Sequence, residues 1–261
     1  MIEPAWPAPA NVLALTTSRQ GLDGEPGVSL GHYASFNLAE HVQDRPEAVA
    51  ANRQRLQAYI GRGGLREIQW LDQVHGTAVY RSTGGVAAAP EADAAISSEP
   101  GRALAVLTAD CLPVLLCDRA GTEVAAVHAG WRGLCNGVLR NSVAAFARPP
   151  DQLMAWLGPA ISARHFEVGE EVLQRFSAHF DGPQRAAIAA AFVPRQGRDG
   201  KYLADLYQLA RLQLQSLGVD AIYGGEHCTV ADTQGEEALF YSYRREPCCG
   251  RQATIIGLRA E

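Results

Sequence analysis

The chain has 261 residues, a net charge of −5 at pH 7 and 47% hydrophobic residues. These values are typical of a globular protein with a full hydrophobic core, and the negative charge argues against nucleic acid as the main partner. The chain contains neither a long uncharged apolar run nor a signal-peptide pattern, so we expect no membrane span and a cytoplasmic protein with reduced cysteines.

The first half of the chain is predicted to be rich in strands. A strand over 11–17 and a glycine-rich loop precede a helix that Asp44 is placed to cap, with Pro46 in its first turn. This helix is expected to run to about Ile60, where Gly61 to Gly64 stop it. Short apolar runs separated by turns then predict strands at 66–71, 77–81, 92–97, 103–108, 112–117 and 123–128.

Helices become more frequent after residue 130. We expect helices over 132–147, from Glu167 to about residue 180 and from Asp205 to Gly218, with a partly helical connection over 181–200. Further strands are expected at 153–157, 219–223, 240–243 and 254–258. Because the strands cluster rather than alternate strictly with helices, the predicted fold class is α+β, with one domain over residues 1–261.

Three residues that can bind a metal or act in catalysis follow predicted strands. His75, Cys111 and His128 each lie at or just beyond the C-terminal end of an apolar run, where a rigid sheet presents side chains to a cleft. Two histidines and a cysteine can bind zinc and leave its fourth position open. A single cysteine or histidine in such a run is more often part of the core, so the local sequence leaves both roles open.

The motifs around these residues resemble those of the YfiH family, also called laccase-like multicopper polyphenol oxidases and peptidoglycan editing factors. The motifs are Gln73-Val74-His75-Gly76, Ala109-Asp110-Cys111-Leu112-Pro113 and His128-Ala129-Gly130-Trp131-Arg132-Gly133. Weaker matches extend the resemblance over nearly the whole chain: Phe36-Asn37-Leu38 with His41-Val42, Gly158-Pro159-Ala160-Ile161, Phe166-Glu167-Val168-Gly169, Ser242-Tyr243-Arg244-Arg245 and Gly250-Arg251.

This resemblance implies a function, a metal and a fold. It implies that His75, Cys111 and His128 bind zinc, and that the substrates are phosphate and a purine nucleoside. The implied reactions are phosphorolysis of adenosine, inosine and methylthioadenosine, and deamination of adenosine. The implied fold is a sandwich of mixed β-sheets with flanking helices, distantly like the deamidase domain of cytotoxic necrotizing factor toxins. Neither the preferred nucleoside nor the oligomeric state follows from it.

Catalysis is assigned to Cys111, His128 and Asp110. A zinc ion with an open position makes water nucleophilic near neutral pH, and deamination also needs a proton shuttle. Asp110 is a candidate for that shuttle, or alternatively an acceptor that orients a ligating histidine.

Substrate binding is assigned to polar residues within the family motifs and to Arg19. Arg132 begins a predicted helix, where free backbone N–H groups also favour phosphate. Arg19 and Arg244 are further phosphate candidates, each with a surface salt bridge as its alternative role. Gln73 either binds a base edge or bonds to the backbone of its own turn. Asn37 and His41 line the pocket or fix its loops.

Four alternatives remain open. Two histidines and one cysteine also suit a copper oxidase, although the chain has seven histidines and no His-x-His pair. Cys111 could instead be the nucleophile of a hydrolase with His128 as its base. A role in editing peptidoglycan precursors would need a larger pocket. A purely structural zinc site would need a fourth ligand, such as Cys117, Cys135 or Cys228.

Overall fold

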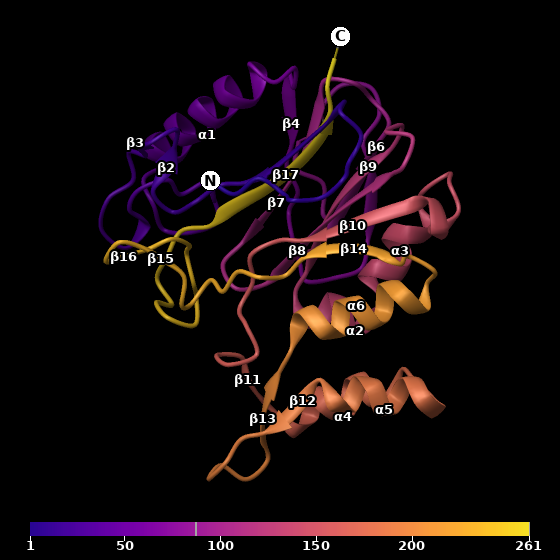
Figure 1. Ribbon diagram of the computed structural model, residues 1–261. Coiled ribbons are helices and arrows are strands. Elements are labelled where there is room, and N and C mark those ends of the chain that lie inside the picture. Colours follow the sequence, from indigo (N-terminus) through magenta and orange to yellow (C-terminus); the bar gives the residue numbers. More distant parts are fainter. Residues whose placement is uncertain (87, 261) are drawn as a thin grey trace.

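Two mixed β-sheets packed face to face dominate the computed structural model, which describes residues 1–86 and 88–260 (Figure 1). The four-stranded sheet has the order β1 (Val12–Thr16), β17 (Gln252–Leu258), β7 (Arg102–Thr108) and β4 (Glu67–Gln69). The six-stranded sheet has the order β14 (Ala221–Gly224), β10 (Leu153–Leu157), β8 (Leu112–Asp118), β9 (Val124–Ala129), β6 (Ala94–Ser97) and β5 (Val79–Arg81). Inner strands pair antiparallel, whereas β4, β5 and β14 pair parallel at sheet edges.

Residues of β7 alternate between two apolar layers. Ala103, Ala105 and Leu107 belong to the cluster under α1 (Pro46–Gly61), and Leu104 and Val106 belong to the cluster between the sheets. This alternation follows from the two-residue period of a strand, which sends successive side chains to opposite faces. The four-stranded sheet is therefore covered by a helix on one side and by the second sheet on the other.

Helices cover the outer face of the six-stranded sheet in the same way. Ala125 and Val127 of β9 pack in the cluster shared with α3 (Val138–Ala144) and α6 (Leu206–Ser216), and α2 (Trp131–Asn136) follows β9 directly. Val124 and Ala126 face the other sheet. By the same period, His128 lies on the face between the sheets, at the end of its strand. The predicted sandwich of mixed sheets with flanking helices is confirmed.

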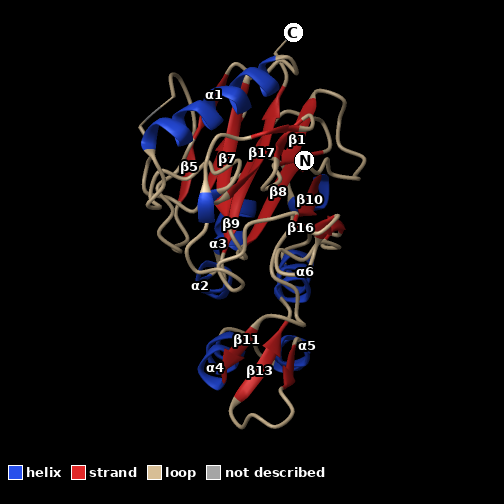
Figure 2. Ribbon diagram, turned by 90° about the vertical axis from the view of Figure 1, so that its left-hand side faces the viewer, coloured by secondary structure: helices blue, strands red, loops and turns tan. Residues whose placement is uncertain are grey.

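A smaller unit extends away from the two sheets on the side of α6 (Figure 2). Its apolar residues, including Phe176, Ile188 and Phe192, share a core cluster with Leu209 of α6. The prediction of one domain over 1–261 stays a prediction, and residues 87 and 261 lie outside the described part. The unit consists of β11 (Glu167–Gly169), α4 (Glu170–Ala178), α5 (Gly182–Ala190), β12 (Phe192–Pro194) and β13 (Lys201–Ala204).

The remaining elements are short. Two hairpins are formed by β2 (Gly21–Leu22) with β3 (Glu25–Pro26) and by β15 (Thr233–Gln234) with β16 (Glu237–Ala238), and single 3-10 turns span Gly31–Tyr33 and Pro150–Gln152. In the described chain, no helix is long and apolar enough to cross a membrane. The six cysteines are all free.

Several element boundaries differ from the predictions. The helix expected over 132–147 is split at Gly137, whose φ of 101° is left-handed and ends α2. Residues 167–169 form a strand before α4 rather than the start of a helix, and β13 was not predicted. Residues 240–243, all described, form a loop in place of the expected strand, with Phe240, Tyr241 and Ser242 buried and Tyr243 exposed.

The two helices expected to begin near Asp44 and Asp205 are capped differently. Asp205, the predicted start of its helix, caps α6, since its Oδ1 accepts a hydrogen bond from the backbone N–H of Gln208 at 3.0 Å. Asp44 does not cap α1, because Arg45 occupies the N-cap position without a side-chain cap bond. Instead the Asp44 carboxylate accepts hydrogen bonds from Ser29 Oγ and Asn37 Nδ2.

Candidate metal centre

Three side chains from separate segments converge at one end of the sandwich. His75 lies in the loop after β4, Cys111 lies in the turn between β7 and β8, and His128 lies in β9. Their candidate ligand atoms all lie within 4.8 Å of one another, and Cys111 Sγ is 3.8 Å from His75 Nε2. The two imidazole rings are 4.8 Å apart between centroids and nearly perpendicular, with an interplanar angle of 78°. His75 is exposed and His128 is buried, so the group opens to solvent on one side.

The residue types and spacing of this group fit a zinc ion. A thiolate and two imidazoles are ligands that zinc prefers, and three protein ligands leave a fourth position for water or substrate. Among the described residues, this is the only group of three or more His, Cys, Asp or Glu side chains close enough to share a metal. Cys117, Cys135 and Cys228 do not join it.

Asp93, which the sequence analysis did not identify, contacts both histidines. Its Oδ1 accepts a hydrogen bond from His128 Nδ1 at 2.7 Å and one from the backbone N–H of His75 at 2.9 Å. Its Oδ2 accepts from the backbone N–H of Gly76 at 2.6 Å. The only sequence signal for Asp93 is a single carboxylate beside the apolar run Ala94–Ser97.

The electrostatics of the group favour a thiolate. Burial raises the pKa of the Cys111 thiol, but the charge and hydrogen bonds of His128 and His75 outweigh it and lower this pKa to about 6. Burial lowers the pKa of His128, whereas Cys111 and Asp93 raise it, to about 9. The thiolate is the form of cysteine that binds metals and acts as a nucleophile.

Gly130 lies against the same three side chains. A Cβ at this position would lie 3.0 Å from His75 Cδ2, 3.1 Å from Cys111 Sγ and 3.6 Å from His128 Cε1. The Gly130 backbone has φ −59° and ψ 154°, which any residue can adopt. Space, rather than backbone conformation, is therefore the reason for glycine at this position.

Replacing Gly130 with alanine is expected to weaken zinc binding by roughly 10–100-fold, because overpacking a tight site typically costs 1–3 kcal/mol. Zinc affinity, measured by competition with a chromogenic chelator, checks this expectation. Gly61→Ala is a suitable control, because a Cβ there would meet nothing within 4 Å. Equal zinc affinity in the Gly130 and Gly61 variants would contradict the expectation.

The Asp110 carboxylate accepts hydrogen bonds from two residues of the C-terminal part of the chain. Its Oδ1 accepts a hydrogen bond from Thr229 Oγ1 at 2.6 Å, and its Oδ2 accepts from the backbone N–H of Arg244 at 2.6 Å. The alternative role predicted for Asp110 was to accept a hydrogen bond from a ligating histidine. Asp93 has this role for His128. Proton transfer by Asp110 stays a prediction, and it would compete with these two bonds.

The other predicted polar residues form bonds within the fold. Gln73 bonds to β7 rather than to its own turn: its Nε2 donates to Leu107 O at 2.8 Å, and its Oε1 accepts from Leu107 N–H at 2.7 Å. Asn37 is fully buried and accepts from the N–H groups of Ala39 and Arg251. Burial, followed by the charge of Arg251, lowers the pKa of His41. Their roles in substrate binding stay predictions.

The predicted phosphate-binding arginines differ in how their guanidinium groups are used. Arg19 donates to Ala34 O and pairs with Glu246 at 3.2 Å. Arg132 is exposed, and its guanidinium lies 4.6 Å from the Trp131 ring centroid. Within the described chain it has no hydrogen-bond or ion-pair partner, so it is the most available of the three.

The guanidinium of Arg244 is committed to the backbone of the smaller unit. Its two terminal nitrogens donate to His165 O at 3.0 Å and Glu167 O at 3.3 Å, and it lies 5.6 Å from the Phe166 ring centroid. Binding phosphate through Arg244 would therefore compete with these contacts.

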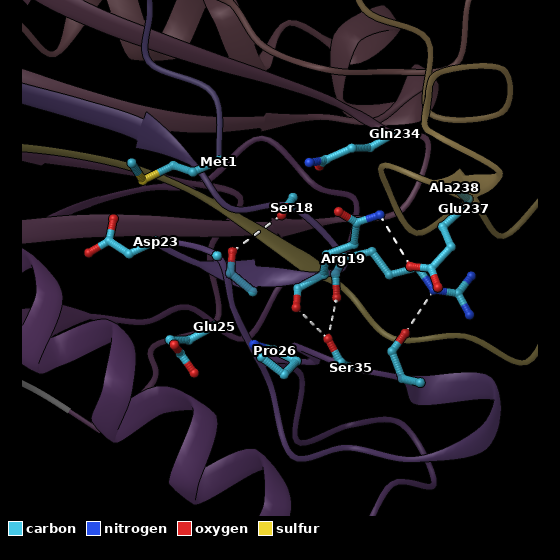
Figure 3. Close-up of a pocket in the computed structure, with 14 residues that line it drawn as sticks. Met1, Ser18, Arg19, Asp23, Glu25, Pro26, Ser35, Gln234, Glu237 and Ala238 are labelled. Atoms are coloured by element: carbon cyan, nitrogen blue, oxygen red, sulfur yellow. Dashed lines mark hydrogen bonds between the residues drawn. The ribbon is translucent and has the colours of Figure 1, made fainter.

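A large pocket of about 830 Å³ has none of the three converging side chains in its lining, which Figure 3 shows. The hairpins β2–β3 and β15–β16 line it, and Gln20 Nε2 donates to Glu237 Oε2 across it at 3.3 Å. Of the predicted site residues only Arg19 lines this pocket. Its size therefore says nothing about the chemistry of the cysteine and two histidines.

Comparisons with known proteins cover almost the full length of the chain. The family described as multi-copper polyphenol oxidoreductase laccase matches residues 14–259. A Shigella flexneri protein named purine nucleoside phosphorylase YfiH is 49% identical over 259 residues, which are 99% of this chain and 98% of that protein. A Pseudomonas aeruginosa protein, also named purine nucleoside phosphorylase, is 46% identical with the same two coverages.

Solved structures show the same similarity in three dimensions. A Neisseria meningitidis protein of the DUF152 family has a TM-score of 0.89 and 48% identity, and the match covers 99% of both chains. YlmD from Geobacillus stearothermophilus has a TM-score of 0.83 and 30% identity, with 96% of this chain and 93% of that chain covered.

Proposed function

The chain belongs to the family described as multi-copper polyphenol oxidoreductase laccase, and we propose that within this family it is a metal-dependent purine nucleoside phosphorylase. The predicted resemblance to YfiH is confirmed by relatives of that name. The proposed substrates are phosphate and adenosine, inosine or methylthioadenosine, and adenosine deamination is proposed as a second reaction of the same site. A cytoplasmic location is part of the proposal.

The observation that supports this function best is the convergence of His75, Cys111 and His128 around one point. Three ligand atoms within 4.8 Å of one another are suited to a single ion, and no fourth His, Cys, Asp or Glu of the described residues joins them. A bound zinc ion with an open position supplies Lewis-acid chemistry, which makes water a better nucleophile near neutral pH. An open position favours a catalytic ion over a structural one.

We propose zinc rather than copper as the metal. A blue-copper site also uses two histidines and a cysteine, so the three ligands alone suit either metal. A multicopper oxidase would need further groups of histidines, and the described residues contain only one group of metal-binding side chains. The family description therefore need not imply laccase chemistry in this chain.

Phosphorolysis requires an anion site close to the nucleoside. A phosphate oxygen bonds to C1′ of the ribose while the bond from C1′ to the purine nitrogen breaks. Arg132 lies four residues after His128 and has an available guanidinium, so we assign phosphate binding to it. Asn37, His41 and Gln73 are assigned to holding the loops around the nucleoside, in keeping with their bonds within the fold.

A second candidate function is supported by Cys111, His128 and Asp93 together. The Cys111 thiol has a lowered pKa and lies beside His128, and the buried Asp93 carboxylate orients that histidine. This arrangement resembles a cysteine–histidine–aspartate catalytic triad. In this reading the metal-free protein is an amide or ester hydrolase. Zinc on Cys111 would block its action as a nucleophile, so metal occupancy separates the two proposals. Peptidoglycan-precursor editing has no structural observation in its favour.

Metal content and adenosine turnover test the proposed function. We expect about one zinc ion per chain in the purified protein, adenine formed in the presence of phosphate, and inosine formed in its absence. Removing zinc with a chelator should abolish both products, and returning zinc should restore them. Metal-free protein with no nucleoside turnover and a Cys111 that iodoacetamide readily alkylates would instead support the hydrolase.

A further inference from the structure

Asp93 is a fully buried carboxylate that immediately precedes β6. Register explains its position, because Ala94 of β6 pairs with Val127 of β9 and so brings Asp93 beside His128. The backbone N–H of His128 also donates to Asp93 O, at 2.7 Å. The same carboxylate reaches the loop that carries His75.

Three consecutive backbone N–H groups of that loop converge on the Asp93 carboxylate. Val74 N and Gly76 N donate to Oδ2 at 3.3 and 2.6 Å, and His75 N donates to Oδ1 at 2.9 Å. His75 itself has φ 60°, a left-handed conformation that is unfavourable for residues other than glycine. A negative charge that accepts all three N–H groups stabilises this turn in the form that directs the imidazole to Cys111.

The bond to His128 fixes the other imidazole. Nδ1 donates its hydrogen to Asp93 Oδ1, so Nε2 carries the lone pair in the neutral ring. One oxygen of Asp93 thus contacts both histidines. Within the described chain, the carboxylate forms no hydrogen bond or ion pair with the predicted substrate residues.

We propose that Asp93 is the positioning residue for both histidine ligands, setting the tautomer of His128 and the backbone conformation of His75. This inference rests on the proposed metal site and adds the residue that organises it. Asp93 is not itself one of the three candidate ligands. It determines where two of the three ligand atoms lie before a metal binds.

An amide at position 93 cannot replace the carboxylate. Asparagine has one acceptor oxygen and one NH₂ group, so either His128 Nδ1 or the N–H groups of Val74 and Gly76 would face another donor. Replacing a residue that hydrogen-bonds to a metal ligand typically weakens metal binding by roughly 10–100-fold. Asp93→Asn is therefore expected to weaken zinc binding by roughly 10–100-fold.

Asp118 provides a matched control. It is also fully buried, and its carboxylate also accepts hydrogen bonds from backbone N–H groups, those of Thr122 and Glu123, at the far end of β8. Asp118→Asn should lower thermal stability without weakening zinc binding. The experiment compares zinc affinity by chelator competition, the absorption spectrum with cobalt in place of zinc, and the melting temperature of the metal-free protein.

Amide hydrogen exchange on the metal-free wild-type protein gives a second, variant-free test. The N–H groups of Val74 and His75 belong to exposed residues, yet they should exchange slowly because Asp93 accepts them. Two results together support the inference. The Val74 and His75 amides exchange slowly in the wild type, and zinc affinity and the cobalt spectrum change only in Asp93→Asn. Unchanged zinc affinity, an equal loss in Asp118→Asn, or fast exchange of these amides in the wild type would overturn it. A wild-type protein without zinc affinity would overturn the proposed function, and the exchange measurement would still decide the role of Asp93.

Discussion

Replacing His75, Cys111 or His128 with alanine is expected to weaken zinc binding by more than about 100-fold and to abolish adenosine phosphorolysis. Replacing a residue that only contacts a metal ligand typically weakens metal binding by roughly 10–100-fold, and replacing a ligand itself should weaken it further. The core should survive, because His75 is exposed, Cys111 is partly exposed, and the buried His128 is the next-to-last residue of β9. Zinc affinity and adenine formation, measured on the same preparations, check the expectation.

Cys117→Ala is the matched control for the cysteine variant. Cys117 is a fully buried thiol in β8, between the two sheets, so its loss should lower the melting temperature and leave zinc affinity unchanged. The three ligand variants should instead lose zinc affinity while the melting temperature of the metal-free protein stays unchanged. Adenosine turnover that persists in a metal-free triple variant would rule out the proposed mechanism.

Local periodicity was sufficient to predict the central strands and the α+β class, whereas the sandwich of mixed sheets was implied by the family resemblance. The runs over 103–108, 112–117 and 123–128 became β7, β8 and β9 with nearly the expected bounds, because a buried strand is a continuous apolar run. The convergence of Cys111 and His128 also follows from these strands, since β8 and β9 pair antiparallel and place Pro113 opposite His128. The strand order therefore explains why Cys111 and His128 lie close together, whereas their assignment with His75 as metal ligands came from the family resemblance.

The partners of polar side chains could not be predicted, because they depend on contacts between distant segments. Asp93 bonds to His128 only because β6 pairs with β9, and Gln73 reaches Leu107 only because its loop lies against β7. Likewise, nothing near Arg244 indicates that its guanidinium bonds to the backbone at His165. Residue type predicted which side chains could act, and the tertiary structure decided which of them were already engaged.

Arg132→Ala is expected to raise the KM for phosphate by about 100-fold with zinc affinity unchanged. Hydrogen bonds to a charged group are each worth about 1.5–3 kcal/mol, and every 1.4 kcal/mol is tenfold in affinity, so losing one or two such bonds accounts for a change of this size. Arg132→Lys should give a smaller increase, because lysine keeps the charge but not the two-pronged geometry. Initial rates of adenine formation against phosphate concentration measure the effect.

Variants of Arg140 and Arg244 show whether a change in the KM for phosphate comes from a specific phosphate site or from the loss of any positive charge. Arg140 is exposed on α3, so Arg140→Ala removes the same charge from a neighbouring helix and should leave the KM for phosphate unchanged. Arg244→Ala removes bonds to the backbone of His165 and Glu167, so it should lower thermal stability first. A rise in the phosphate KM confined to Arg244→Ala would move the anion site to the loop between β16 and β17. A rise confined to Arg132→Ala would place it four residues after His128, beside the proposed metal centre.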